Sequence, residues 1–121
     1  MKPVEFLKRL MEIFNQSSIA YQQYLAGGKT FRFARDLKFH NSNALRLLIE
    51  NKATLPEELQ EDIQSLIIHY SEWSEKWEKL AAEEEHHPDD VFVFANDTTF
   101  PRVAAQNIEM ALITLNSLNS A

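Results

Sequence analysis

The sequence predicts an all-α fold, a four-helix up-down bundle that forms a single domain over residues 1–121. Apolar residues recur at spacings of three and four along most of the chain, as they do on the buried face of a helix. The 121 residues include only two Gly and four Pro, so few positions interrupt a helix. Because short to medium connections separate the four periodic segments, an up-down bundle is the expected packing.

A first helix is predicted from about Pro3 to Ala26. Pro3 suits the first turn, where a helix makes no use of the N–H group that proline lacks. Gly27 and Gly28 should end the helix, because glycine adopts the left-handed cap conformation without a steric penalty from Cβ. The residues expected on its inner face are Val4, Leu7, Leu10, Met11, Phe14, Ser18, Tyr21 and Leu25.

A second helix is predicted from about Thr30 to Glu50, and a long third helix from a capping box at Thr54 and Glu57 to about Glu85. Pro88 follows two histidines and marks the end of the third helix. The second helix should bury Ala34, Leu37, Asn41, Ala44, Leu45 and Leu48. The third should bury Leu59, Ile63, Leu66, Ile67, Tyr70, Trp73, Trp77, Leu80 and Ala81.

An extended connector, at about residues 88–99, is predicted before the last helix. Its β-branched and aromatic run at 91–95 is typical of a strand, but the sequence contains no second strand to pair with it. We therefore expect an extended or single-turn segment whose aromatic side chains pack on the bundle. Turn and N-cap residues at 96–99 precede a last helix from about Phe100 to Leu118. Its inward residues should be Ala104, Ile108, Ala111, Leu112, Leu115 and Leu118.

The charge of the chain is divided unevenly. Residues 1–52 contain nine Lys and Arg against four acidic residues, whereas residues 53–121 contain three against fourteen. The two parts therefore carry +5 and −11, within a formal net charge of −6. This asymmetry indicates an anionic partner, self-association, or one face of the fold that neutralises another.

The composition excludes several classes of protein. Without cysteine, the chain has no disulfide framework and no thiolate metal site. Its N-terminus lacks the apolar core of a signal peptide, and no apolar run approaches the roughly 18 residues of a membrane span. We therefore expect a soluble, cytoplasmic protein that does not bind membranes. The sequence indicates no cofactor and no metal.

The basic segment 29–46 is the clearest candidate for recognition. It mixes cations with phenylalanines, a combination suited to neutralising phosphates and stacking on bases. The other interpretation is that its cations pair with acids of the third helix and its phenylalanines lie in the core, which the −11 charge of the remaining chain favours. The candidate anion-binding or nucleic-acid-binding residues are Lys29, Arg32, Lys38 and Arg46.

Within this segment, the hexapeptide 35–40 has the sequence Arg-Asp-Leu-Lys-Phe-His. It resembles the Arg-x4–6-His signature of HEPN ribonucleases, small all-helical domains that cleave RNA at a composite site on a dimer interface. The resemblance covers these six residues. It implies that Arg35 stabilises phosphate charge and that His40 transfers a proton. Asp36 lies one helical turn before His40, so its carboxylate could orient the imidazole. The alternative is a purely structural role, in which Arg32 and Asp36 form a pair on the helix surface and His40 lies near the rim of the core.

Three other segments have both a functional and a structural interpretation. Segment 83–90 combines acids with two histidines, as divalent-ion sites do, but such a helix end is normally solvated. Trp73 and Trp77 are expected in the core rather than in a ligand cage. The connector at 91–100 either forms a recognition loop or closes one end of the bundle.

The sequence therefore favours a small protein-interaction or regulatory module without chemistry of its own. Its partner would be another protein or a second copy of the chain. Phe39 and Ile68 fall outside the predicted core, which favours a homodimer. The alternative function is a HEPN-like dimeric domain that binds RNA, or cleaves it without a metal, through Arg35 and His40.

Overall fold

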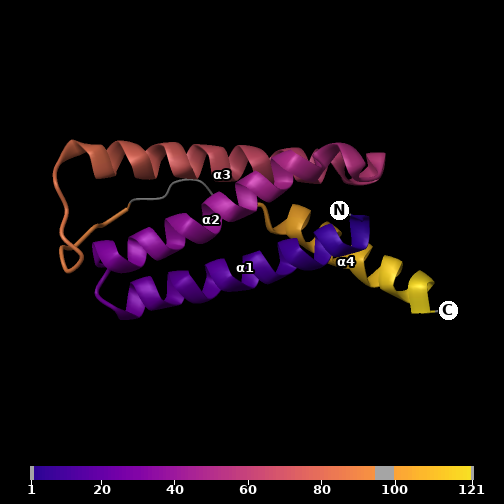
Figure 1. The fold of residues 1–121 in the computed structure, drawn as a ribbon, viewed down its shortest axis with the longest axis horizontal. Coiled ribbons are helices and arrows are strands. Elements are labelled where there is room, and N and C mark those ends of the chain that lie inside the picture. Colours follow the sequence, from indigo (N-terminus) through magenta and orange to yellow (C-terminus); the bar gives the residue numbers. More distant parts are fainter. Residues whose placement is uncertain (1, 95–99, 121) are drawn as a thin grey trace.

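Helices account for most of the computed structural model, which describes residues 2–94 and 100–120 (Figure 1). Within them the chain forms α1 (Pro3–Ala26), α2 (Phe31–Asn51), the short 3₁₀ helix η1 (Lys52–Thr54), α3 (Glu57–Glu83) and α4 (Arg102–Ser120). Successive α-helices run up and down, and each packs on its neighbours in the order α1, α2, α3, α4 and back to α1. The predicted all-α four-helix bundle is confirmed.

The main core lies where all four α-helices meet. Its buried residues include Leu10 of α1, Leu48 of α2, Leu66 of α3 and Ile108 of α4, each essentially inaccessible to solvent. Phe100, just before α4, packs its ring edge against Phe14 with the ring centroids 5.7 Å apart. α4 therefore closes the fourth side of the bundle over the first half of α3.

A second core cluster fills the other end of the bundle, where the connector takes the place of α4. Trp73 and Trp77 are both buried, which confirms their prediction as core residues. Phe92 lies 5.3 Å from the Trp77 ring and Phe94 lies 5.3 Å from the Trp73 ring, measured between ring centroids. The connector thus supplies the aromatic side chains that cover the second half of α3.

The backbone of the connector is paired with the start of α2. The N–H of Phe31 donates to the carbonyl of Asp90 at 2.8 Å, and the N–H of Arg32 donates to the carbonyl of Pro88 at 2.9 Å. In return, the Phe92 N–H donates to the carbonyl of Lys29 at 2.8 Å. These bonds satisfy amide groups of the first turn of α2 that have no partner within the helix. They also explain how a strand-like run forms without a second strand: it pairs with the loop between α1 and α2.

The two glycines after α1 have different roles. Gly28 has φ of +82°, the left-handed conformation predicted for the helix end. Gly27 has φ of −87°, so its conformation does not require glycine. A Cβ at Gly27 would lie 2.2 Å from the ring of Phe33, however, and would collide with it. Gly27 is therefore needed for the close packing of α2 on α1.

The predicted inner face of α1 is wrong in its second half. Tyr21 and Leu25 are exposed, whereas Ala20 and Tyr24 are buried. The predicted stripe followed a seven-residue repeat, which drifts around a straight helix by about 20° per repeat. Moreover, the second half of α1 packs on α2 and on the connector, whereas the first half also packs on α4. The buried face of the second half is therefore rotated about the helix axis relative to that of the first half.

The helix ends also differ from the prediction. The Thr54 hydroxyl donates to the Asn51 carbonyl at 2.8 Å within the η1 turn, and α3 begins at Glu57 without a side-chain cap, so the capping box does not form. α3 ends at Glu83, two residues early, and α4 begins two residues late. Leu118, predicted inward, is exposed on the last turn of α4.

The Tyr24 hydroxyl provides a direct test of connector docking. It donates to the Phe92 carbonyl and accepts from the Phe94 N–H at 3.3 Å. We expect Tyr24→Phe to lower the free energy of unfolding by about 1–2 kcal/mol, because it removes both bonds in a mostly buried position. Urea unfolding measures the loss. The control is Tyr21→Phe on the exposed side of α1, which should change it by less than about 0.5 kcal/mol. Equal effects would contradict this role of Tyr24.

Burial of Tyr70 predicts a loss of stability at alkaline pH. Desolvation raises the pKa of the Tyr70 phenol above its usual value of 10. Above pH 10 the unfolded chain therefore releases this proton while the folded chain retains it, and the free energy of unfolding falls by about 1.4 kcal/mol per pH unit. Denaturant unfolding at several pH values above 10 should show a shallower fall for Tyr70→Phe. Identical slopes for the two proteins would contradict the prediction.

Candidate functional site

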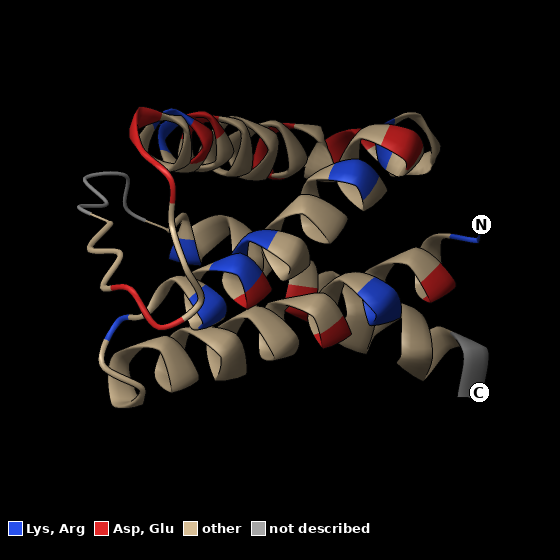
Figure 2. Ribbon diagram, turned by 60° about the vertical axis from the view of Figure 1, so that its left-hand side comes forward, with Lys and Arg blue, Asp and Glu red and all other residues tan. Residues whose placement is uncertain are grey.

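The outer face of α2 carries the basic segment. Arg32, Arg35, Phe39 and Arg46 are all exposed there, with Phe39 at 61% exposure. Figure 2 shows Lys and Arg gathered along α2, while Asp and Glu lie along α3 and the turn that follows it. An exposed phenylalanine among arginines is a surface feature that the bundle itself does not use.

Lys38 belongs to the interior of the α2–α3 contact instead. Its side chain is only 19% exposed, and its Nζ lies 3.2 Å from the carboxylate of Glu78 and 3.2 Å from the Ser42 hydroxyl. The ammonium group also lies 5.6 Å from the centroid of the Trp77 ring. This cation is thus neutralised by the acidic third helix, as the internal-pairing interpretation expects.

The arginines are paired less completely. Arg32 forms an ion pair with Asp89 of the connector at 3.2 Å, rather than with Asp36. Both side chains are more than half exposed, so this pair contributes little to stability. The guanidinium of Arg35 lies 5.3 Å from the Phe31 ring centroid. Within the described residues, neither Arg35 nor Arg46 has an acidic partner at ion-pair distance, so both charges face outward.

Arg35 and His40 are not brought together within one chain. Five residues apart on a helix, they point in directions roughly 140° apart. Arg35 is exposed, whereas His40 is half-buried next to the Phe39 ring, with its Nδ1 buried and without a hydrogen-bond partner in the described part of the chain. Asp36 is exposed, and no hydrogen bond between it and His40 forms there. The catalytic pair therefore stays a prediction.

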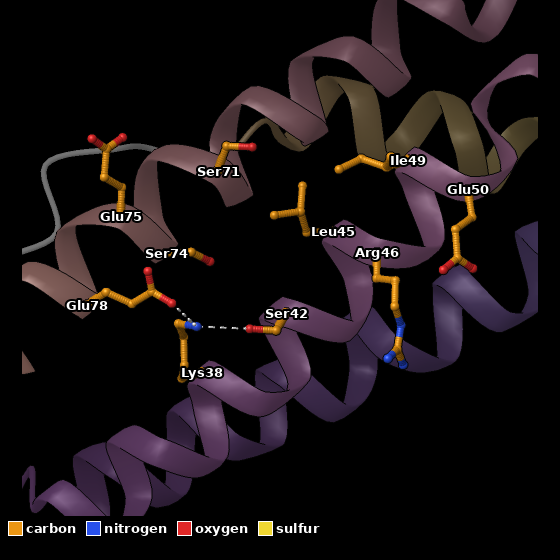
Figure 3. A pocket seen from close by; sticks show the side chains of 10 residues that line it. All are labelled: Lys38, Ser42, Leu45, Arg46, Ile49, Glu50, Ser71, Ser74, Glu75 and Glu78. Atoms are coloured by element: carbon orange, nitrogen blue, oxygen red, sulfur yellow. Dashed lines mark hydrogen bonds and ion pairs between the residues drawn. The ribbon is translucent and has the colours of Figure 1, made fainter.

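A groove between α2 and α3, with a volume of about 550 Å³, was not anticipated from the sequence (Figure 3). Leu45 and Ile49 point into it, and Arg46 and Glu75 stand on its opposite rims. Its lining residues are Lys38, Ser42, Leu45, Arg46, Ile49, Glu50, Ser71, Ser74, Glu75 and Glu78. Ser42, Ser71 and Ser74 lie along the α2–α3 contact, and their small side chains leave the groove unfilled. They are the sequence signal that could have indicated the groove.

The other candidate segments do not form a site among the described residues. Glu83 and His87 are both exposed, and the His87 N–H donates to the Asp90 carboxylate at 2.8 Å, which makes this segment a solvated turn. No group of three or more His, Asp or Glu side chains in residues 2–94 and 100–120 is placed to hold a metal ion. The predicted turn at 96–99 lies outside the described residues.

Known proteins give no further guide to this surface. No protein-family model matches the chain, and neither the curated proteins nor the solved structures include a match. Within the described helices, none is both long and apolar enough to cross a membrane.

We expect no RNA cleavage that depends on His40, because the fold separates it from Arg35. A fluorescent single-stranded RNA can be incubated with the wild-type protein and with Arg35→Ala and His40→Ala variants. A histidine acting in proton transfer contributes about 100-fold or more to a rate. Cleavage by the wild type that falls by this factor in both variants would contradict the expectation. It would also restore the HEPN-like alternative.

Proposed function

We propose that the protein is an interaction module that binds a protein partner through the outer face of α2 and α3 and performs no reaction of its own. The observation that carries this proposal is the composition of that face. It combines exposed apolar side chains with arginines on one helix and glutamates on the next. We call it the α2–α3 face and define it by Arg35, Phe39, Arg46 and Ile49 of α2 and by Ile68, Glu72 and Glu75 of α3.

The apolar part of the α2–α3 face is substantial. Phe39 is 61% exposed, Ile49 is 51% exposed and Ile68 is 48% exposed. Single exposed apolar residues are common on protein surfaces, but several on neighbouring helices form a patch that association can bury. Phe39 is the expected anchor of this contact, because aromatic residues and arginine are enriched at the centres of protein interfaces.

The charges of this face favour a protein over a nucleic acid. A nucleic-acid strand that contacted Arg35 and Arg46 would bring its phosphates toward Glu72 and Glu75 on the adjacent helix. The chain as a whole is also acidic, with a formal charge of −6. Nucleic-acid binding normally requires an uninterrupted basic surface. A protein surface with both signs of charge meets no such repulsion.

The groove supports the same proposal. Half of its ten lining residues are charged, whereas small-molecule pockets are mostly apolar with a few polar groups. The side chains of Arg46 and Glu75 point away from each other on the two rims (Figure 3). A groove of this kind accommodates an apolar side chain of a protein partner between two charged rims.

Site-specific photo-crosslinking in the producing cells tests the proposal. A benzophenone amino acid at position 49 and, separately, at position 68 should form adducts with the same protein, identified by mass spectrometry. The same amino acid at position 110 is the control, since Met110 is 61% exposed on α4, away from the proposed face. Adducts no more abundant at 49 and 68 than at 110 would reject the α2–α3 face as a binding site.

A further inference from the structure

We infer that the partner of the α2–α3 face is a second copy of this chain, with α2 of each protomer packed on α3 of the other. This inference rests on the proposed function and identifies its partner. It makes the protein a two-fold symmetric homodimer whose interface is the groove and its two rims.

The argument begins with the distribution of charge across the face. The α2 side of the face carries Arg35 and Arg46, which lack acidic partners in the described part of the chain, together with one acid, Glu50. The α3 side carries Glu72 and Glu75, together with one exposed base, Lys79. In a two-fold dimer each surface contacts the same surface of the other protomer. A surface with a mainly basic α2 rim and a mainly acidic α3 rim is complementary to its own copy, provided that the symmetry operation exchanges the rims.

Only one direction of the two-fold axis within the face exchanges the rims. A rotation about an axis across the helices would lay α2 on α2 and bring arginine against arginine. A rotation about an axis along the groove lays α2 on the partner subunit's α3, and the reverse, so that opposite charges meet twice. Because α2 and α3 are antiparallel, each α2 then runs antiparallel to the α3 that it contacts. Electrostatic complementarity of this kind determines the orientation of association.

The centre of the face is suited to close contact. Ile49 lies in the groove next to Leu45, near the proposed axis, so both copies of it would be buried together. Ser42, Ser71 and Ser74 are small, which lets the helices of the two protomers approach closely. Phe39 and Ile68 do not line the groove but are exposed on the same two helices, and their contact with the partner subunit would add to the buried apolar area.

The second half of α1 exposes Ile19, Tyr21 and Leu25 but carries no charged residue over residues 17–26. The face of α4 is another exposed apolar surface, with Val103, Met110 and Ile113. Its only acidic residue is Glu109, and its only basic residue is Arg102 at the first turn. No charge pattern on α4 selects a partner or an orientation. The α2–α3 face is therefore the one for which the structure specifies an occupant.

Charge reversal in two separate proteins tests the proposed orientation. Arg46→Glu creates a homodimer with glutamate against glutamate at both contacts, and Glu75→Arg creates one with arginine against arginine. Sedimentation velocity over a concentration series should show that the wild type dimerises and that each variant dimerises about ten- to thirty-fold more weakly. An equimolar mixture of the two variants should dimerise again, because both contacts in the mixed dimer join opposite charges.

Matched controls separate this effect from net charge and from misfolding. Arg9→Glu on α1 and Glu109→Arg on α4 make the same changes of charge at exposed positions outside the face, and should leave the wild-type dimerisation unchanged. Circular dichroism should show equal helix content in all variants. Since misfolded variants would not regain dimerisation on mixing, the mixture is the decisive measurement.

Two results would overturn the inference. A wild-type protein that sediments as a monomer at every concentration would exclude a second copy as the partner. A dimer unaffected by either substitution, or a mixture of the variants that stays monomeric, would exclude the proposed orientation. A monomeric wild type that nevertheless crosslinks one other protein from positions 49 and 68 would leave the proposed function standing. Absence of any adduct from these positions would reject both.

Discussion

The closure of the fourth side of the bundle is the constraint on which the rest of the structure depends. α3 has 27 residues and presents an apolar stripe along its length, but α4 has 19 residues and covers only its first half. The second half carries two tryptophans, whose burial requires apolar side chains from outside α4. Phe92 and Phe94 of the connector supply them. A segment without helical structure therefore completes the core of a helical protein.

This solution works because the connector finds backbone partners at the start of α2. An extended segment packed against a bundle needs hydrogen bonds for its N–H and C=O groups, and the first turn of a helix has free N–H groups. The carbonyl groups of the connector accept hydrogen bonds from the free N–H groups of α2. The Tyr24 hydroxyl of α1 forms two further hydrogen bonds with the connector backbone. The same docking places Asp89 beside Arg32. One end of the basic segment is thus held by the connector.

The position of α2 then determines which of its cations remain available. Lys38 faces α3 and is neutralised by Glu78 over the Trp77 ring. Arg35 and Arg46 face outward and have no acidic partner in the described part of the chain. The strong asymmetry of the sequence is therefore divided between an internal pairing and an external surface. On that surface both signs of charge lie on adjacent helices, with a groove between them.

The sequence by itself determined the four helices, the aromatic core residues of α3 and the exposure of Phe39 and Ile68. These features depend on the 3.6-residue period and on local composition, which a single segment contains. Only the tertiary structure decided the buried face of the second half of α1, the ion-pair partner of Arg32 and the α2–α3 groove. Each of these depends on which residues distant in sequence face each other, and on how much room their side chains leave. Helical periodicity says which side of a helix is apolar; it does not say what lies opposite.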